Sequence, residues 1–110
     1  MLVSHNDIQE MIQTIKDRII ERFQPERIIL FGSHARGDAG SDSDVDILVV
    51  IDMKGSKREK AIEIGSLLHD IPVAKDIIVS TSEEYEWRKD VTGTIEYPAS
   101  HDGVILYAKP

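Results

Sequence analysis

Two apolar runs, separated by a glycine-serine turn and a polar loop, constrain the fold of this chain most strongly. The first run ends in Phe31-Gly32-Ser33-His34-Ala35-Arg36-Gly37, and the second begins with Ser43-Asp44-Val45-Asp46-Ile47-Leu48-Val49-Val50. Short apolar runs rich in β-branched residues predict buried strands. Since side chains at positions i and i+2 leave the same face of a strand, Asp44 and Asp46 are expected to point the same way.

Two carboxylates in such proximity indicate a metal site. They repel each other unless a cation lies between them. Oxygen ligands of this kind suit Mg²⁺, which keeps several waters and often takes its other ligands from substrate phosphates. Aspartate is also common at strand starts and in turns, and the nearby Asp38 and Asp42 are interpreted in that way.

The turn between the two runs predicts a phosphate site. If 28–31 is a strand, Gly32 and Ser33 lie where the chain leaves it and enters a helix, whose start offers unpaired backbone N–H groups. Glycine lets the backbone approach an anion closely. The Ser33 hydroxyl can add a donor or can cap the helix, and Arg36 supplies a positive charge or remains a surface residue. Ser43 can brace the turn ahead of the second run or order the loop.

A third carboxylate, Asp76, lies in the centre of the apolar run 73–79. Burying a carboxylate there without a partner is costly. Either this run is an edge strand with Asp76 facing water, or Asp76 faces the other two acids. Lys75, one position earlier, is expected to point to the opposite face.

The motif reads G-S-x-A-R-G-x5-S-D-x-D-[IL]-x-V without a gap. It resembles the active-site motif of the DNA polymerase beta-like nucleotidyltransferase superfamily. The closest resemblance is to the minimal nucleotidyltransferases, which are stand-alone proteins of about this size and are often paired with HEPN-domain proteins as antitoxins. The resemblance covers most of the chain, from the first helix to the segment 103–107.

The resemblance implies transfer of AMP from ATP to a hydroxyl group, with two Mg²⁺ ions as cofactors. The acids Asp44, Asp46 and Asp76 are then the catalytic and metal-binding residues. The implied nucleotide-binding residues are Gly32, Ser33, Arg36 and Ser43. The implied acceptor is a tyrosine of a HEPN-type toxin, with this chain as its antitoxin. Two alternatives stay open: a non-catalytic antitoxin that neutralises its partner by binding, and nucleotidylation of a small-molecule alcohol.

Length and charge limit other functions. The 110 residues predict a single domain over 1–110. The net charge of −7 makes a long nucleic acid a poor partner, because such binding depends on Lys and Arg neutralising phosphates. No apolar run approaches the ~18 residues of a membrane span. Without a signal-peptide pattern or any cysteine, a cytoplasmic location is expected.

The remaining pattern predicts helices alternating with strands. A first helix, capped by Asn6 or Asp7, ends near Phe23 ahead of Pro25. Strands are expected at 27–31, 45–52 and 73–80, with helices or turns at 33–37, from 56 to near 72, from a cap at Ser82, and around 96–97 despite Pro98. The segment 104–107 is an edge strand or an ordered tail. The expected class is α+β, with a palm-like nucleotidyltransferase fold: a mixed sheet of three or slightly more strands covered by helices.

The histidines and large aromatic residues add no further site. The histidines share no ligand spacing and are interpreted as ordinary surface or partly packed residues, including His34 within the motif. Tyr85 and Trp87 are interpreted as core or interface residues.

Overall fold

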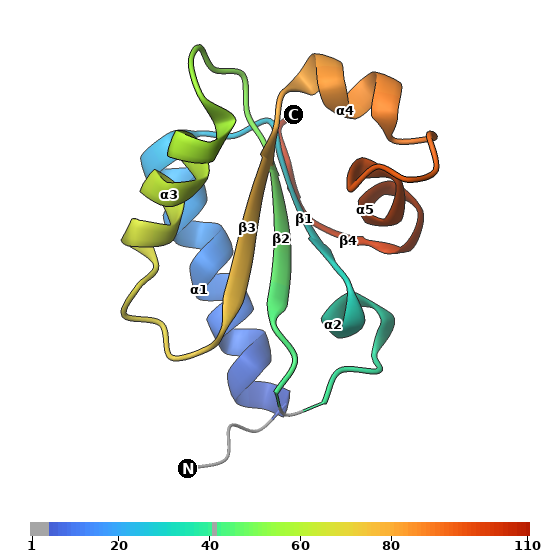
Figure 1. The fold of residues 1–110 in the computed structure, drawn as a ribbon. Coiled ribbons are helices and arrows are strands. Elements are labelled where there is room, and N and C mark those ends of the chain that lie inside the picture. Colours follow the sequence, from blue (N-terminus) through green and yellow to red (C-terminus); the bar gives the residue numbers. More distant parts are fainter. Residues whose placement is uncertain (1–4, 41) are drawn as a thin grey trace.

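The computed structural model describes residues 5–40 and 42–110. In these residues a mixed sheet of four strands, in the order β3-β2-β1-β4, carries helices on both faces (Figure 1). Strands β2 and β3 are parallel, whereas β1 is antiparallel to both of its neighbours. The bounds are β1 (Arg27–Phe31), β2 (Val45–Val50), β3 (Lys75–Ser80) and β4 (Val104–Ala108). The expected α+β class is therefore confirmed, with one more strand than the minimum.

The helices divide between the two faces of the sheet (Figure 1). One face is covered by α1 (His5–Phe23) and α3 (Lys57–Leu67). The other face carries α2 (Ser33–Arg36), α4 (Ser82–Arg88) and α5 (Glu96–Asp102). None of the helices in the described residues is both long and apolar enough to cross a bilayer.

Alternation along the strands builds a core on each face. Ile28 and Leu30 of β1 pack with α1 and α3, and Ile29 and Phe31 pack with Tyr85 of α4 on the other side. Fully burying a side chain of this size contributes about 1.5–3 kcal/mol. The larger core includes Ile12, Ile15 and Ile19 of α1, Ile47 and Val49 of β2, and Ile64 of α3.

Several element ends differ from expectation. Helix α1 begins at His5, so Asn6 and Asp7 lie within its first turn and not ahead of it. Strand β2 ends at Val50, and two residues later the Asp52 carboxylate accepts a hydrogen bond from the amide of Ser82 at 3.2 Å. Strand β3 begins at Lys75, because a tight turn occupies the preceding residues.

The cap of α4 is Thr81 and not Ser82: its hydroxyl accepts a hydrogen bond from the amide of Glu84 at 3.2 Å. Pro98 is tolerated in α5 because it lies in the first turn, where an N–H has no intrahelical partner. The segment 104–107 was expected to be either an edge strand or an ordered tail. It is an edge strand, since β4 (104–108) pairs with β1. Tyr85 is buried, as expected of a core residue, and Trp87 is exposed.

Candidate functional site

The three candidate acids lie near the start of the β2–β3 pair. Asp46 and Asp76 are in register across the two parallel strands, so their side chains leave the same face. Their neighbours Ile47 and Ile77 pack on the opposite face against the α1 and α3 core. Asp44 lies two residues before Asp46, just ahead of β2.

The pKa of Asp46 reflects its burial and its two acidic neighbours. Burial, followed by the negative charges of Asp76 and Asp44, raises the pKa of the Asp46 carboxyl above its ordinary value. The positive side chains of His34 and Arg36 act in the opposite direction. The site therefore concentrates negative charge at Asp46, where a bound cation lowers the energy of the ionised form.

The three carboxylates do not form a closed ligand cage. Within residues 5–40 and 42–110, no group of three His, Asp or Glu side chains is arranged closely enough to hold a metal ion. The donor set is nevertheless made of carboxylate oxygens alone, which suits a hard cation such as Mg²⁺ that completes its shell with water and phosphate. The residues therefore fit a magnesium site by chemistry and by charge.

Asp76 combines the two alternatives that its sequence position left open. Strand β3 is an edge strand and Asp76 is exposed, yet Asp76 shares its face with Asp46. Lys75 turns to the other side, where its ammonium donates to the carbonyls of Ile71 and Val73 at 2.9 and 3.0 Å. The carboxylate is thus directed away from the nearest cation in sequence.

Gly32 brings the turn directly against this cluster. It precedes α2 with φ 76° and ψ −158°, a conformation that is essentially restricted to glycine. A Cβ atom built on Gly32 would overlap Oδ2 of Asp46. The absence of a side chain is therefore required both by the backbone conformation and by the neighbouring carboxylate.

The turn after Gly32 presents backbone donors. The amides of Ala35 and Arg36 both donate to the Gly32 carbonyl at 3.1 Å. The preceding amides, of Ser33 and His34, are the first of the helix and have no intrahelical acceptor. Because α2 is a single turn, its attraction for an anion rests on these N–H groups more than on a helix dipole.

Ser33 and Arg36 differ in the contacts that their side chains already make. Ser33 is the first residue of α2 and not its N-cap, which is Gly32. The Arg36 guanidinium is 3.4 Å from the Asp38 carboxylate, with both side chains about half exposed. Such a surface pair is weak, so Arg36 remains able to turn toward a phosphate.

Ser43 and His34 hold the loop that leads to Asp44. The Ser43 hydroxyl accepts a hydrogen bond from the Gly40 amide at 2.9 Å, so it braces the loop. The Ser43 carbonyl lies 3.0 Å from Nε2 of His34. Because a carbonyl can only accept, this nitrogen carries the proton.

His34 is thus a site residue that sequence reasoning missed. It ties α2 to the residue before Asp44 and adds positive potential at Asp46. The signal that could have identified it is its position between Ser33 and Arg36 inside the motif, rather than any metal-ligand spacing.

Comparisons with known proteins show the family to which this chain is similar. Residues 12–99 match the family model described as the nucleotidyltransferase domain. "Putative protein adenylyltransferase MJ0141" of Methanocaldococcus jannaschii is 38% identical over 76 residues, which cover 67% of this chain and 76% of that protein. "Protein adenylyltransferase MntA" of Thermococcus cleftensis is 42% identical over 48 residues, which cover 44% of this chain and 48% of that protein.

A solved structure has the same fold. The crystal structure of a "putative nucleotidyltransferase" from Sulfolobus solfataricus superposes with a TM-score of 0.67 at 24% identity, covering 96% of this chain and 84% of that chain. The fold expected from the motif is confirmed by this likeness.

Proposed function

The chain belongs to the nucleotidyltransferase domain family and is an enzyme of that class, and we propose that it transfers AMP from ATP to a hydroxyl of a partner protein. The observation that carries the proposal is the register of Asp46 with Asp76, beside Asp44 and the Gly32 turn. Relatives named as protein adenylyltransferases support a protein as the acceptor.

Each site residue has a role in this proposal. The turn at Gly32 and Ser33 holds the β and γ phosphates through its backbone amides and the serine hydroxyl, and Arg36 adds positive charge. Ser43 keeps the loop ordered on the nucleotide side of the site, since its hydroxyl already accepts from the Gly40 amide.

The acids hold the metal. Asp44, Asp46 and Asp76 would hold the Mg²⁺ ions through their carboxylate oxygens. When bound, these ions supply Lewis-acid activation of the acceptor oxygen and stabilise the charge of the leaving pyrophosphate. The proximity of three carboxylates, costly in itself, is explained by this use, because a protein that only binds its partner does not need three convergent acids.

The reaction balances as a single displacement. The acceptor hydroxyl oxygen forms a bond with the α-phosphorus of ATP, and the bond from that phosphorus to the oxygen bridging to the β-phosphate breaks. Pyrophosphate leaves, and the hydroxyl proton passes to Asp76, which is exposed on the edge strand β3. The protein's contribution is alignment of hydroxyl and α-phosphate.

We infer a tyrosine of a HEPN-type toxin as the acceptor and antitoxin action as the biological role. The support is the resemblance of the G-S-x-A-R-G and S-D-x-D motif to minimal nucleotidyltransferases of that kind. The acidic surface, with a net charge of −7, fits a protein acceptor better than a template or a tRNA.

The test is AMP transfer to the partner. Incubated with ATP, Mg²⁺ and a HEPN-type protein encoded beside it, the chain is expected to add AMP to that protein, as read by intact-mass spectrometry. Asp44→Asn combined with Asp46→Asn is expected to abolish transfer while association of the two proteins persists. Asp42→Asn, an exposed acid in the adjacent loop, is the matched control and retains transfer.

Two results would replace the proposal. If the double variant neutralises the partner as well as the wild-type chain does, masking by binding is the mechanism. If the wild-type chain modifies a small alcohol and never the partner, the acceptor is not a protein.

A further inference from the structure

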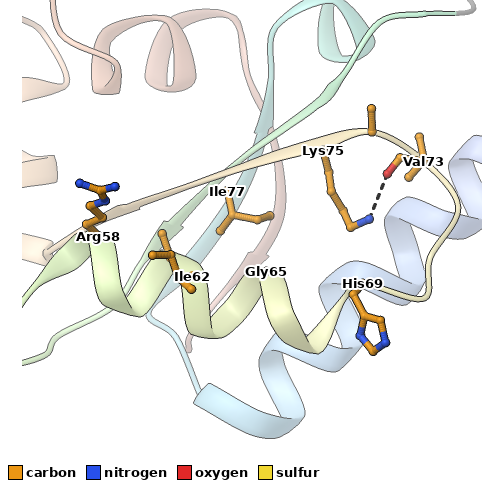
Figure 2. A pocket seen from close by; sticks show the side chains of 9 residues that line it. Arg58, Ile62, Gly65, His69, Val73, Lys75 and Ile77 are labelled. Carbon is orange, nitrogen blue, oxygen red and sulfur yellow. Dashed lines mark hydrogen bonds between the residues drawn. The ribbon is translucent and has the colours of Figure 1, made fainter.

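A groove runs along the outer strand of the sheet, between β3 and α3 (Figure 2). Its volume is about 510 Å³. The floor is apolar, and three side chains that carry or can carry positive charge complete the lining. The apolar and small residues are Ala61, Ile62, Gly65, Val73, Ala74 and Ile77, and the basic ones are Arg58, His69 and Lys75.

The floor of the groove is incompletely covered by the chain itself. Ile62 of α3 is 59% exposed. Figure 2 shows Ile77 projecting from β3 toward α3, on whose surface Ile62 lies. An isoleucine exposed to this extent beside a half-buried one favours an apolar occupant.

The charge of the lining is opposite to that of the whole chain. The groove is lined by Arg58, His69 and Lys75 and by no carboxylate, in a chain of net charge −7. Arg58 lies at one end of the groove and Lys75 at the other (Figure 2), so a positive charge stands at each end of the apolar floor. This pattern is complementary to a segment with apolar residues in its centre and acids at its ends.

The groove lies beside a free strand edge. In the described sheet β3 pairs with β2 on one side and is the terminal strand on the other. Its charged residues, Lys75 and Asp76, are confined to its start, and Ile77, Ile78 and Val79 follow without a charge. An uncharged edge of this kind presents backbone N–H and C=O groups that can pair with another strand.

A strand added to this edge would reach both faces of the sheet. Successive side chains of a strand point to opposite faces. Those on one face would enter the groove beside Ile77, and those on the other would lie on the face of Asp76. Because Asp76 is in register with Asp46, the second face is that of the carboxylate cluster.

We propose that the groove and the free edge of β3 bind an extended acidic segment of the acceptor protein as an additional strand. The proposal rests on the proposed function and specifies how the acceptor hydroxyl reaches the site. The acceptor hydroxyl lies on the face of the sheet opposite the groove, one strand away from Asp76. Seven residues of strand span about 20 Å, which is enough to pass the roughly 14 Å of α3 between Arg58 and Leu67.

The first test uses a defined peptide in place of the whole partner. The probe is a capped heptapeptide with glutamate at both ends, valine at the third and fifth positions, tyrosine in the centre and threonine at the two others. Titrated into the ¹⁵N-labelled chain without ATP or Mg²⁺, it is expected to shift the amide signals of β3, including Ile77 and Val79. Unchanged signals in β3 at millimolar peptide, or shifts confined to β4, overturn the proposal.

Matched variants locate the binding surface. Ile62→Asp is expected to lower the affinity for the peptide by about tenfold or more. Ile105→Asp serves as its control, because Ile105 is 57% exposed on the opposite edge of the sheet, and this variant is expected to bind as the wild type does. Equal weakening by both variants counts against the groove.

A charge exchange tests the complementarity. Arg58→Glu is expected to lower the affinity for the acidic peptide and to raise the affinity for a peptide with lysine in place of both glutamates. The first turn of α3 tolerates an acid, so this variant keeps its fold. If Arg58→Glu leaves the ratio of the two affinities unchanged, the inference that the bound segment is acidic is wrong.

The same variants separate this inference from the proposed function. In AMP transfer to the HEPN-type partner, Ile62→Asp is expected to raise KM and leave kcat unchanged, because it removes docking contacts and no reacting group. An unchanged KM overturns the groove and leaves the proposed function intact. Peptide binding in β3 without transfer by the wild-type chain overturns the proposed function and leaves the groove intact.

Discussion

The Cα atom of Gly32 lies so close to the Asp46 carboxylate that no side chain fits between them. The backbone of Gly32 has φ 76° and ψ −158°, a conformation that only glycine adopts without strain. The turn that offers N–H groups and the acid at the centre of the cluster are therefore packed as one unit. A change at either residue is expected to disturb the other.

Gly32→Ala is expected to lower the free energy of unfolding by about 1–3 kcal/mol from backbone strain, and by more where the new methyl displaces Asp46. It should also weaken binding of ATP with Mg²⁺, measured by calorimetry. Gly37→Ala is the control: Gly37 also has a positive φ, 87°, but open space around it, so it should cost about 1 kcal/mol and leave nucleotide binding intact. Equal effects of the two variants on ATP binding would disprove the coupling.

Asp46→Asn is expected to stabilise the metal-free protein. The pKa of Asp46 is raised by burial and by two neighbouring carboxylates, so its ionised form costs free energy in the folded state. Removing the charge should raise the thermal unfolding midpoint at pH 7. The gain should shrink as the pH falls through the raised pKa of the folded state and vanish below the ordinary pKa of 3.8, where the carboxyl is protonated in both states.

The magnesium dependence of that gain is the second part of the measurement. Adding Mg²⁺ should raise the unfolding midpoint of the wild-type chain more than that of Asp46→Asn. Asp42→Asn, in the exposed loop ahead of β2, should respond to Mg²⁺ as the wild type does. An equal response of Asp46→Asn would remove Asp46 from the metal site.

Ser33→Ala and Arg36→Ala are expected to weaken ATP binding more than they weaken Mg²⁺ binding. Hydrogen bonds to a charged phosphate contribute about 1.5–3 kcal/mol each, or roughly 10- to 100-fold in affinity. Isothermal titration with ATP should show this loss only when Mg²⁺ is present, because the triphosphate otherwise meets three carboxylates. Equal affinity for ATP in the presence of a chelator contradicts the site, and Arg22→Ala on α1 is the neutral control.

The ion pair between Arg18 and Asp70 predicts a pH dependence of stability away from the site. Arg18 donates to both oxygens of Asp70, at 2.5 and 3.0 Å, and thereby lowers the pKa of that carboxyl to about 2. A lowered pKa means that the folded state binds the proton less tightly than the unfolded chain does. The contribution of the ion pair to stability is therefore complete above the ordinary aspartate pKa of 3.8 and is lost as the pH falls through about 2.

Asp70→Asn should accordingly lower the urea midpoint at pH 7 and have little effect near pH 2. Both groups of the pair are at the surface, so the loss at pH 7 is expected to be small. Asp17→Asn, an exposed acid on α1, controls for the general effect of removing a negative charge. A change in the urea midpoint of Asp70→Asn that is the same at both pH values would contradict the lowered pKa of Asp70.

The strands were predictable because their signal is local. The run Arg27–Phe31 and the start of β2 at Val45 follow from uninterrupted apolar, β-branched residues, and the structure confirms both. The cap of α4 was not predictable in the same way. Thr81 and Ser82 are adjacent and chemically equivalent as caps, and the choice depends on which hydroxyl lies near the Glu84 amide.

The site was predictable as a set of residues but not as an arrangement. The motif identifies Gly32, Asp44 and Asp46 from one continuous stretch. The proximity of Asp76 depends on the register of β2 and β3, which the crossover through α3 sets, and no local pattern encodes it. The contact of His34 with the Ser43 carbonyl likewise depends on how the loop folds back.

The pairing of β2 with β3 has a consequence for the identity of the charge at the site. In the observed alignment Asp46 faces Asp76 across the strands, and Lys75 projects from the reverse side. A slip of one residue would turn every side chain of β3 over. If the slip set Lys75 opposite Asp46, an ammonium would stand where a carboxylate now stands and would neutralise Asp46 from within the protein. Correct alignment of the two strands is thus an electrostatic requirement as much as a steric one, and a misaligned chain would be self-inhibited rather than merely disordered.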